Sequence, residues 1–177
     1  SYAYLGGIAG TLQSTSIKNC YNDGRGTLYT ARDTTYFNQI YGGFIVGDAY
    51  VNALDSVISE CYNIATTYSY YTVNTRAWCA GGLIGQGEDL TVKNCYFNGY
   101  GNSYKDIYFN YNCTTSSVKK INSTSNFANK STYSGFDFNN IWGIGLNNYS
   151  YASFKNPISH THTLTKVPAV AATCTTA

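Results

Sequence analysis

Three copies of one short pattern constrain the fold of this chain more than any other feature. Each copy opens on paired glycines beside apolar residues and continues to an apolar residue that is followed, three positions later, by Cys-Tyr. The cysteines of successive copies lie 41 and then 34 residues apart. Repeats of this length are typical of architectures in which similar units stack on one another. The copies are Gly6-Gly7-Ile8-Ala9-Gly10 with Ile17-Lys18-Asn19-Cys20-Tyr21-Asn22, Gly42-Gly43-Phe44-Ile45-Val46-Gly47 with Ile58-Ser59-Glu60-Cys61-Tyr62-Asn63, and Gly81-Gly82-Leu83-Ile84-Gly85 with Val92-Lys93-Asn94-Cys95-Tyr96-Phe97-Asn98.

The spacing between the apolar residue and the cysteine predicts a bend in each copy. Residues three apart in a straight strand point to opposite faces, whereas a bend lets both point inward. Asn19 and Asn94 occupy the bend position, and asparagine tolerates the left-handed conformation that such a bend requires. Glu60 stands there in the second copy, so we expect a different turn. We predict one inward column of Cys20, Cys61 and Cys95, and inward side chains at Ile8, Ile17, Ile58, Leu83 and Val92.

Strand-forming residues are spread along the chain, with clusters of Gly, Asn and Asp between them, and no helical period is present. A strand, a corner and another strand, repeated and stacked at about 4.8 Å, is the geometry of a parallel β-helix or β-roll. We therefore predict an all-β fold of this solenoid type. The solenoid domain is expected over 1–157, with repeats near 4–27, 41–68 and 79–102, a polar insertion over 103–135, an aromatic closing segment over 136–157, and an extended tail over 158–177.

The blocks resemble the GLUG motif, which is named for its Gly-Leu-any-Gly core. Gly82-Leu83-Ile84-Gly85 matches that core directly, and Gly7-Ile8-Ala9-Gly10 matches it with Ile for Leu. Gly43-Phe44-Ile45-Val46-Gly47 carries one extra residue. The resemblance implies a module of large secreted or surface-attached proteins, such as adhesins and cell-wall-associated peptidases. In these proteins the motif resembles a scaffold, and the resemblance implies no catalytic residues.

Composition narrows the partners and the compartment. Charged residues make up 11% of the chain, against roughly 25% in ordinary soluble domains, and the net charge is only +2. Nucleic acid is not an expected partner, because binding its backbone needs a dense positive patch. No run of 18 apolar residues is present, so no membrane span is expected. The chain has no Met and starts at Ser1, so we interpret it as a processed or excised piece whose signal peptide is already removed.

Cysteines and sequons favour an extracellular or cell-surface setting. Buried free thiols are the simplest reading of the cysteine column, because three equivalent sulfurs cannot all pair with one another. Disulfides that involve Cys79, Cys113 or Cys174 are the alternative, and the spacing does not choose among the pairings. Four N-glycosylation sequons fall between 112 and 150, at Asn112, Asn122, Asn129 and Asn148.

Candidate catalytic groups are few, and we expect neither an enzyme nor a cofactor. The two histidines, His160 and His162, have no accompanying metal-binding motif, and no Gly-x-Ser-x-Gly sequence is present. Four carboxylates follow the glycine blocks and are interpreted as solvated turn residues, with weak calcium binding as an alternative. They are Asp48, Asp55, Glu88 and Asp89.

We predict a structural protein, the subunit or module of a surface fibre, appendage or adhesin. Its partners would be copies of itself, joined head to tail, or the rest of a longer surface protein. The tail, with Leu164 and Val167, is expected to add as a strand to a neighbour. A carbohydrate-, surface- or ice-binding module is the first alternative, with aligned tyrosines that stack on sugar rings. A polysaccharide-degrading β-helix is the second alternative.

Overall fold

Parallel strands in register form the repeat region of the molecule. The computed structural model describes residues 2–24, 26–29, 39–50, 55–65, 68–71, 78–99, 105–146 and 148–155. These residues form β-strands and two short 3-10 helices, and no α-helix occurs among them. The predicted all-β class and the predicted parallel pairing of the repeats are confirmed.

The first sheet gathers the glycine blocks. Its strand order is β1-β6-β11-β7-β2, with β13 on the other side of β11, and all of its pairings are parallel. The long strand β11 pairs with both β6 and β7, so one strand of the third copy spans two strands of the second. The members are β1 (Tyr2–Gly6), β2 (Ala9–Thr11), β6 (Gln39–Gly43), β7 (Val46–Ala49), β11 (Trp78–Glu88) and β13 (Lys105–Tyr111).

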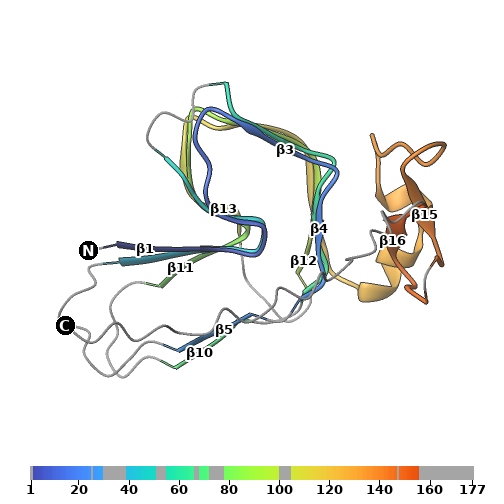
Figure 1. Cartoon of the computed structure of the whole chain (residues 1–177), viewed down its shortest axis with the longest axis horizontal. Coiled ribbons are helices and arrows are strands. Elements are labelled where there is room, and N and C mark those ends of the chain that lie inside the picture. Colours follow the sequence, from blue (N-terminus) through green and yellow to red (C-terminus); the bar gives the residue numbers. More distant parts are fainter. Residues whose placement is uncertain are drawn as a thin grey trace, which may run out of the picture.

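The second sheet gathers the segments around the cysteines, in the order β3-β8-β12-β9-β4 with β14 beside β12. Its register pairs Ile17 with Ile58, Ile58 with Val92, and Val92 with Thr115. The chain thus makes four passes over both sheets, and the passes follow one path in Figure 1. The members are β3 (Ser16–Lys18), β4 (Tyr21–Asn22), β8 (Val57–Ser59), β9 (Tyr62–Asn63), β12 (Thr91–Asn98) and β14 (Thr114–Ile121).

The fourth pass corrects the predicted polar insertion over 103–135. Strands β13 and β14 pair in parallel with β11 and β12, so residues 105–121 continue the stack. Their polar composition has a physical reason: β14 pairs on one side only among the described strands, and most of its side chains are exposed. Only Val118 and Ile121 of β14 are partly buried. A pass at the end of the stack needs few apolar residues, so the sequence of the fourth pass did not show the pattern of the other three.

The core between the two sheets bears out most of the predicted inward residues. Ile58, Leu83 and Val92 are fully buried, and Ile17 is partly buried against them. Ile8 was predicted inward and is 43% exposed, so that prediction is wrong. Ile8 lies in the first pass, where no described strand covers it. The buried members of this core are Leu12, Ile45, Val46, Ala49, Ile58, Cys61, Leu83, Ile84, Leu90, Val92, Cys95, Phe97 and Ile107.

The bend is present before the cysteine in three passes and before Val118 in the fourth. Asn19 and Asn94 have φ values of 52° and 51°, as predicted for a left-handed corner. Glu60 has φ 50° and therefore turns in the same way, which corrects the expectation of a different turn. Ser117 occupies the equivalent place in β14 with φ 53°. Stacking fixes this backbone geometry, because each corner must follow the corner of the neighbouring pass.

The extra residue assigned to the second glycine block is also corrected. Gly43 pairs with both Gly6 and Gly81, and Val46 pairs with Ala9 and Ile84. The three blocks therefore have the same length, and Phe44 occupies the place of the second glycine. A glycine is needed at the first place, since a Cβ at Gly43 would lie 1.9 Å from the Val46 carbonyl oxygen.

Residues beyond the fourth pass form a separate aromatic cluster at the side of the stack. This segment contains η1 (Thr124–Ala128), η2 (Lys130–Thr132) and the antiparallel pair β15 (Trp142–Ile144) and β16 (Ala152–Phe154). In Figure 1 it lies beside β4 and β12. Trp142, fully buried, packs against Tyr62 with ring centroids 5.9 Å apart. The predicted aromatic closing segment thus covers one lateral face of the passes. A further small parallel sheet pairs β5 (Gly26–Tyr29) with β10 (Tyr68–Tyr71).

Candidate functional site

The first edge of the stack exposes residues that are buried in later passes. Ile8 is hydrogen-bonded through its amide to the Ile45 carbonyl, and the Ile45 amide donates to the Leu83 carbonyl, so the three residues form one column. Ile8 is 43% exposed, whereas Ile45 and Leu83 are fully buried. Cys20 is likewise partly exposed at this edge. Strands β1 to β4 have a partner on one side only among the described strands. We call this set of strands the first edge.

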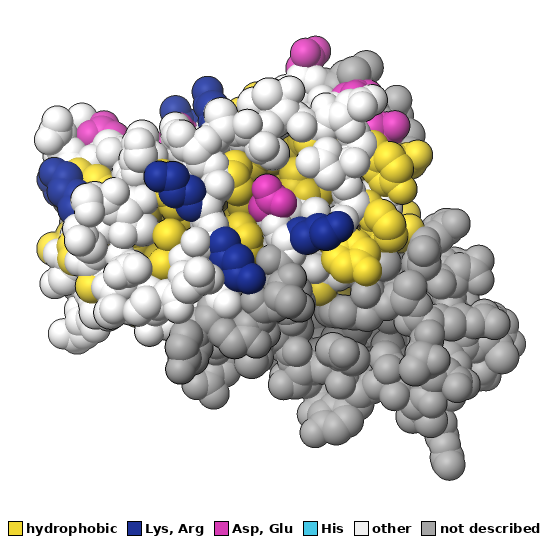
Figure 2. All heavy atoms as spheres, turned by 180° about the vertical axis from the view of Figure 1, so that it is seen from behind, with side chains coloured by type: hydrophobic (Ala, Val, Ile, Leu, Met, Phe, Trp, Pro, Cys, Tyr) yellow, Lys and Arg dark blue, Asp and Glu magenta, His cyan; other side chains and the backbone are white. Residues whose placement is uncertain are grey.

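The last edge is formed by β13 and β14, which also pair on one side only within the described part of the chain. Strand β14 exposes Ser and Thr side chains together with Lys119 and Lys120, whereas β13 carries aromatic residues and Lys105. Figure 2 looks at the molecule from behind and shows basic side chains spread among polar ones. Lysine at a sheet edge is a common way of discouraging unspecific pairing. The two edges are candidate assembly surfaces because both end an in-register parallel stack.

The predicted cysteine column is present. Cys20, Cys61 and Cys95 stand at the same place in successive passes; Cys61 and Cys95 are fully buried, and all three are free thiols. Each thiol donates to the backbone carbonyl two residues before it, at 3.3, 3.1 and 3.2 Å. The pKa of Cys20 is raised, first by its hydrogen bond with Cys61 and then by burial. The three cysteines are therefore packing residues, which agrees with the interpretation of the column as buried free thiols.

The fourth described cysteine, Cys113, is also a free thiol and packs against the core. Burial is the main cause that raises its pKa. Cys174 and the side chain of Cys79 lie outside the described residues, as do His160, His162, Leu164, Val167 and the rest of the tail. The predicted assembly role of the tail therefore stays a prediction.

All four sequon asparagines are exposed: Asn112, Asn122, Asn129 and Asn148. Asn129 differs from the others because its side-chain oxygen accepts hydrogen bonds from the amide and the hydroxyl of Ser131, at 3.0 and 2.9 Å. Asn112 lies at a corner of the fourth pass with φ 57°. The exposure is compatible with glycan attachment, and attachment itself stays a prediction.

The four candidate carboxylates have different surroundings. Asp55 and Asp89 are exposed corner residues with φ 66° and 51°, as expected for turn residues, and Glu88 is partly exposed. Asp48 differs: burial raises its pKa to about 6, although a backbone hydrogen bond from Tyr50 opposes the shift. Its Oδ1 atom is buried and accepts no hydrogen bond among the described residues. Sequence reasoning did not single out Asp48 from the other three.

One further carboxylate, at the bend, was not predicted as a site. Glu60 accepts a hydrogen bond from the Asn94 side-chain amide at 3.1 Å, and its Oε2 lies 3.7 Å from the Lys18 ammonium. That distance makes an ion pair but no hydrogen bond, and Oε2 has no hydrogen-bond partner within the described part of the chain. Since Lys18 is 64% exposed, solvent weakens the pair. Through Lys18, Glu60 and Asn94, these contacts connect the first three passes at one corner.

The described residues contain neither a metal-binding cluster nor a membrane-spanning helix. Within the described residues, no three His, Cys, Asp or Glu side chains lie close enough together to hold a metal ion. None of the helices in that part of the chain is long and apolar enough to cross a membrane.

Comparison with known proteins bears on the repeat assignment. Residues 1–28 match the family model described as the GLUG motif. This confirms the resemblance drawn from Gly7-Ile8-Ala9-Gly10 and the following Asn19-Cys20-Tyr21. No match was found among curated proteins or among solved structures.

Proposed function

We propose that this chain is an extracellular β-solenoid of GLUG-type repeats that serves as a structural module of a surface fibre or adhesin and assembles end to end. It acts in this role without a cofactor or a catalytic site. The observation that carries the proposal is Ile8, which is 43% exposed while its column neighbours Ile45 and Leu83 are fully buried. One further parallel pass beside β1 and β2 would bury it as they are buried.

The register of the stack says how two copies would meet. If the last edge of one copy takes the place before the first edge of the next, Thr114 lies opposite Ser16 and Val118 lies opposite Cys20. This extends by one pass the register that pairs Thr91 with Thr114 and Cys95 with Val118. A contact of this head-to-tail kind does not close on itself and makes a filament. Backbone hydrogen bonds along both sheets and burial of apolar surface would stabilise the contact.

Charge at the last edge adjusts the strength of this contact. In the extended register Lys119 faces Tyr21 of the next copy and Lys120 faces Asn22, so no like charges lie directly opposite. The two lysines still repel Lys18 of the neighbour at longer range. Salt screens such repulsion over a Debye length of about 8 Å at 0.15 M. We therefore expect assembly to strengthen between low and physiological ionic strength.

Sedimentation velocity and electron microscopy at rising protein concentration test the proposal. Residues 1–177 should form filaments without added ligand. Residues 1–157 measure the contribution of the tail: loss of filaments would assign the connection to the tail, and retained filaments would assign it to the sheet edges. Ile8→Asp is the matched edge variant, and Tyr149→Asp, which changes an exposed residue of the lateral segment, is its control. A full-length protein that stays monomeric at high concentration would contradict end-to-end assembly.

A further inference from the structure

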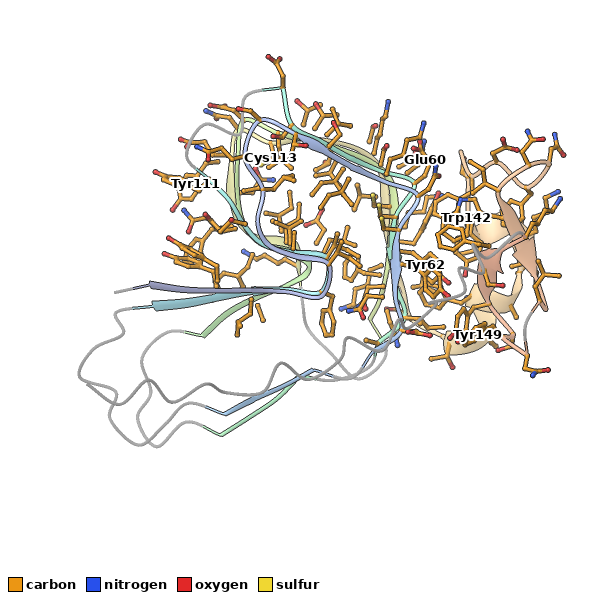
Figure 3. The ribbon with its side chains drawn as sticks, in the orientation of Figure 1. Glu60, Tyr62, Tyr111, Cys113, Trp142 and Tyr149 are labelled. Atoms are coloured by element: carbon orange, nitrogen blue, oxygen red, sulfur yellow. The ribbon has the colours of Figure 1, made fainter. Side chains whose placement is uncertain are left out.

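A row of aromatic rings crosses the stack on the side opposite to the lateral aromatic segment. Tyr4 stacks on Tyr41 with ring centroids 5.7 Å apart, Tyr41 meets Phe109 at 5.9 Å, and Phe109 stacks on Tyr111 at 6.3 Å. Two more rings extend the row, through contacts of 4.9 Å to Phe109 and 5.4 Å to Tyr111. In Figure 3, Tyr111 lies on the far side of the stack from Trp142 and Tyr149. We call these side chains the aromatic row: Tyr4, Tyr41, Tyr50, Tyr108, Phe109 and Tyr111.

The aromatic row has a buried base and an open rim. Tyr41 is only 8% exposed, whereas Tyr4 and Tyr108 are each 37% exposed and Tyr111 is 44% exposed. Figure 2 shows hydrophobic side chains gathered along the margin of the molecule where β13 lies. Three of the five large hydrophobic side chains that are exposed in the described residues belong to this row. The rim therefore offers ring faces to a ligand while the base holds them in place.

Polar groups with hydrogen-bonding capacity lie between the rings. The register places Asp48 beside Gln86 and Gln86 beside Phe109, and it places Glu88 beside Tyr111. Alternate residues of a strand share a face, so Gln86 and Glu88 lie on the same face of β11. The intervening Gly87 faces the core, since a Cβ there would meet Leu90 at 2.7 Å. A carboxylate, an amide and a second carboxylate thus accompany the rings.

Among these three polar side chains, Asp48 is the one whose position the packing of the fold does not explain. Its Oδ1 is buried without a hydrogen-bond partner in the described structure. Such an acceptor destabilises the folded state, because it has lost water and gained nothing in exchange. Burial also raises the pKa of this carboxyl group to about 6. Since Oδ1 is buried, a hydroxyl-rich ligand meets this half-buried carboxyl group through its other oxygen, two strands from Phe109 in the aromatic row.

We propose that the aromatic row, together with Asp48, binds a neutral oligosaccharide. The apolar C–H faces of pyranose rings pack on the exposed rings of Tyr111 and Tyr108, and a sugar hydroxyl donates to Asp48. Tyrosine suits this role because it offers a large rigid surface with little conformational entropy to lose. The row extends from Tyr4 in the first pass to Tyr111 in the fourth, so it follows the direction of stacking. Several sugar units fit such a row better than one.

This site stands on observations that are independent of end-to-end assembly. If copies do join along the stacking direction, the rows of successive copies come into line. A long polysaccharide then meets several equivalent sites, which raises its apparent affinity without any new contact.

Isothermal titration calorimetry with a panel of neutral hexasaccharides tests the site. The probes are cellohexaose, maltohexaose, laminarihexaose, mannohexaose and N-acetylchitohexaose. At least one should bind the full chain, and Tyr111→Ala should weaken that binding by about three- to tenfold, the loss expected for one ring contact. Tyr111→Phe keeps the ring and should retain affinity, which separates loss of the ring from loss of the hydroxyl, and unfolding curves of Tyr111→Ala check that this variant is folded. Asp48→Asn should weaken binding of the same probe. Tyr149→Ala, which removes a ring of similar exposure, is the control and should have no effect.

Three results would overturn the proposal. The first is that no probe binds at millimolar concentration. The second is that Tyr149→Ala weakens binding as much as Tyr111→Ala does. The third is that Tyr111→Ala leaves sugar binding unchanged and instead abolishes association between copies in sedimentation, which would assign the row to a protein interface.

Discussion

Two glycines at the same place in different passes give a sharp test of the stacked arrangement. Gly10 and Gly85 each end the glycine block of their copy. At Gly85, a Cβ would lie 2.5 Å from the Gly47 carbonyl oxygen and 2.8 Å from the Gly42 amide nitrogen. Both contacts are to backbone of the neighbouring pass. At Gly10 the nearest atom to a Cβ is the Tyr4 carbonyl oxygen at 3.4 Å. The same substitution therefore meets a closed site in one pass and an open site in the other.

Gly85→Ala should lower the free energy of unfolding by about 3 kcal/mol or more, because overpacking costs roughly 1–3 kcal/mol where side chains give way and here only backbone is in contact. Gly10→Ala should change it by less than about 1 kcal/mol, and in the stabilising direction, because alanine narrows the unfolded ensemble. A difference of about 3 kcal/mol corresponds to a gap of roughly 6–12 °C in Tm for a chain of this size.

Thermal and urea unfolding, followed by circular dichroism in the far ultraviolet, measure this gap. Comparable stability of the two variants would refute the reasoning, because it would mean that the second and third passes do not approach each other as described. A large loss of stability in Gly10→Ala but not in Gly85→Ala would also refute it, because the crowded glycine would then lie in the first pass and not in the third.

Three more predictions concern single side chains. Burial raises the pKa of Asp48 from 3.8 to about 6, so the stability gained from its protonated form is fully present below pH 3.8 and is lost as the pH rises through 6. Asp48→Asn should therefore raise the free energy of unfolding by roughly 1 kcal/mol at pH 8, after allowance for partial exposure, and by nothing measurable at pH 3.5. Equal effects of the substitution at both pH values would contradict this prediction. Mass-spectrometric mapping of alkylated native protein should find Cys20 and Cys113 modified well before the fully buried Cys61 and Cys95. The buried Tyr62 hydroxyl donates to the Ala152 carbonyl, so Tyr62→Phe should cost about 1–3 kcal/mol, whereas the exposed Tyr149→Phe should be neutral in the same denaturation assay.

Local spacing explains how much of the fold could be predicted from the sequence. The three-residue step from Ile58 to Cys61 requires a bend if both point inward, and the structure has that bend in every pass. The turn at Glu60 was misjudged because residue preference was read without its neighbours. The corners at Asn19 and Asn94 lie in adjacent passes, and they fix the backbone of Glu60 between them.

Two misassignments arose from contacts that a sequence read in one dimension does not show. Phe44 looked like an insertion, yet the register gives it the place of Gly82. A Cβ on Gly82 would meet the ring of Phe97, and the residue that pairs with Phe97 in the second copy is Asn63. The second and third copies thus each hold one aromatic side chain at this spot, supplied from either side of the core, whereas the first copy has Gly7 and Asn22 there.

The fourth pass was missed because its distance from the third is short and its consensus residues are replaced. Val118 stands where the other passes have cysteine, only 23 positions after Cys95, and Ser117 stands where they have Asn or Glu. The paired glycines are missing as well, because Lys105 pairs with Gly81. The candidate saccharide site was missed for a related reason. It is assembled from the first, second and fourth passes, and only the register brings those residues together.

Intermolecular cross-linking of the two stack edges tests the central claim most directly. In the proposed assembly Thr114 of one copy lies opposite Ser16 of the next, and both residues are exposed in the single chain. The double variant Ser16→Cys with Thr114→Cys should give, under mild oxidation at high protein concentration, a ladder of dimers, trimers and longer chains on a non-reducing gel. With Cys20, Cys79, Cys113 and Cys174 replaced by serine in every variant, each single variant should stop at the dimer. A double variant that yields no more cross-linked product than the single variants would contradict end-to-end stacking of this chain.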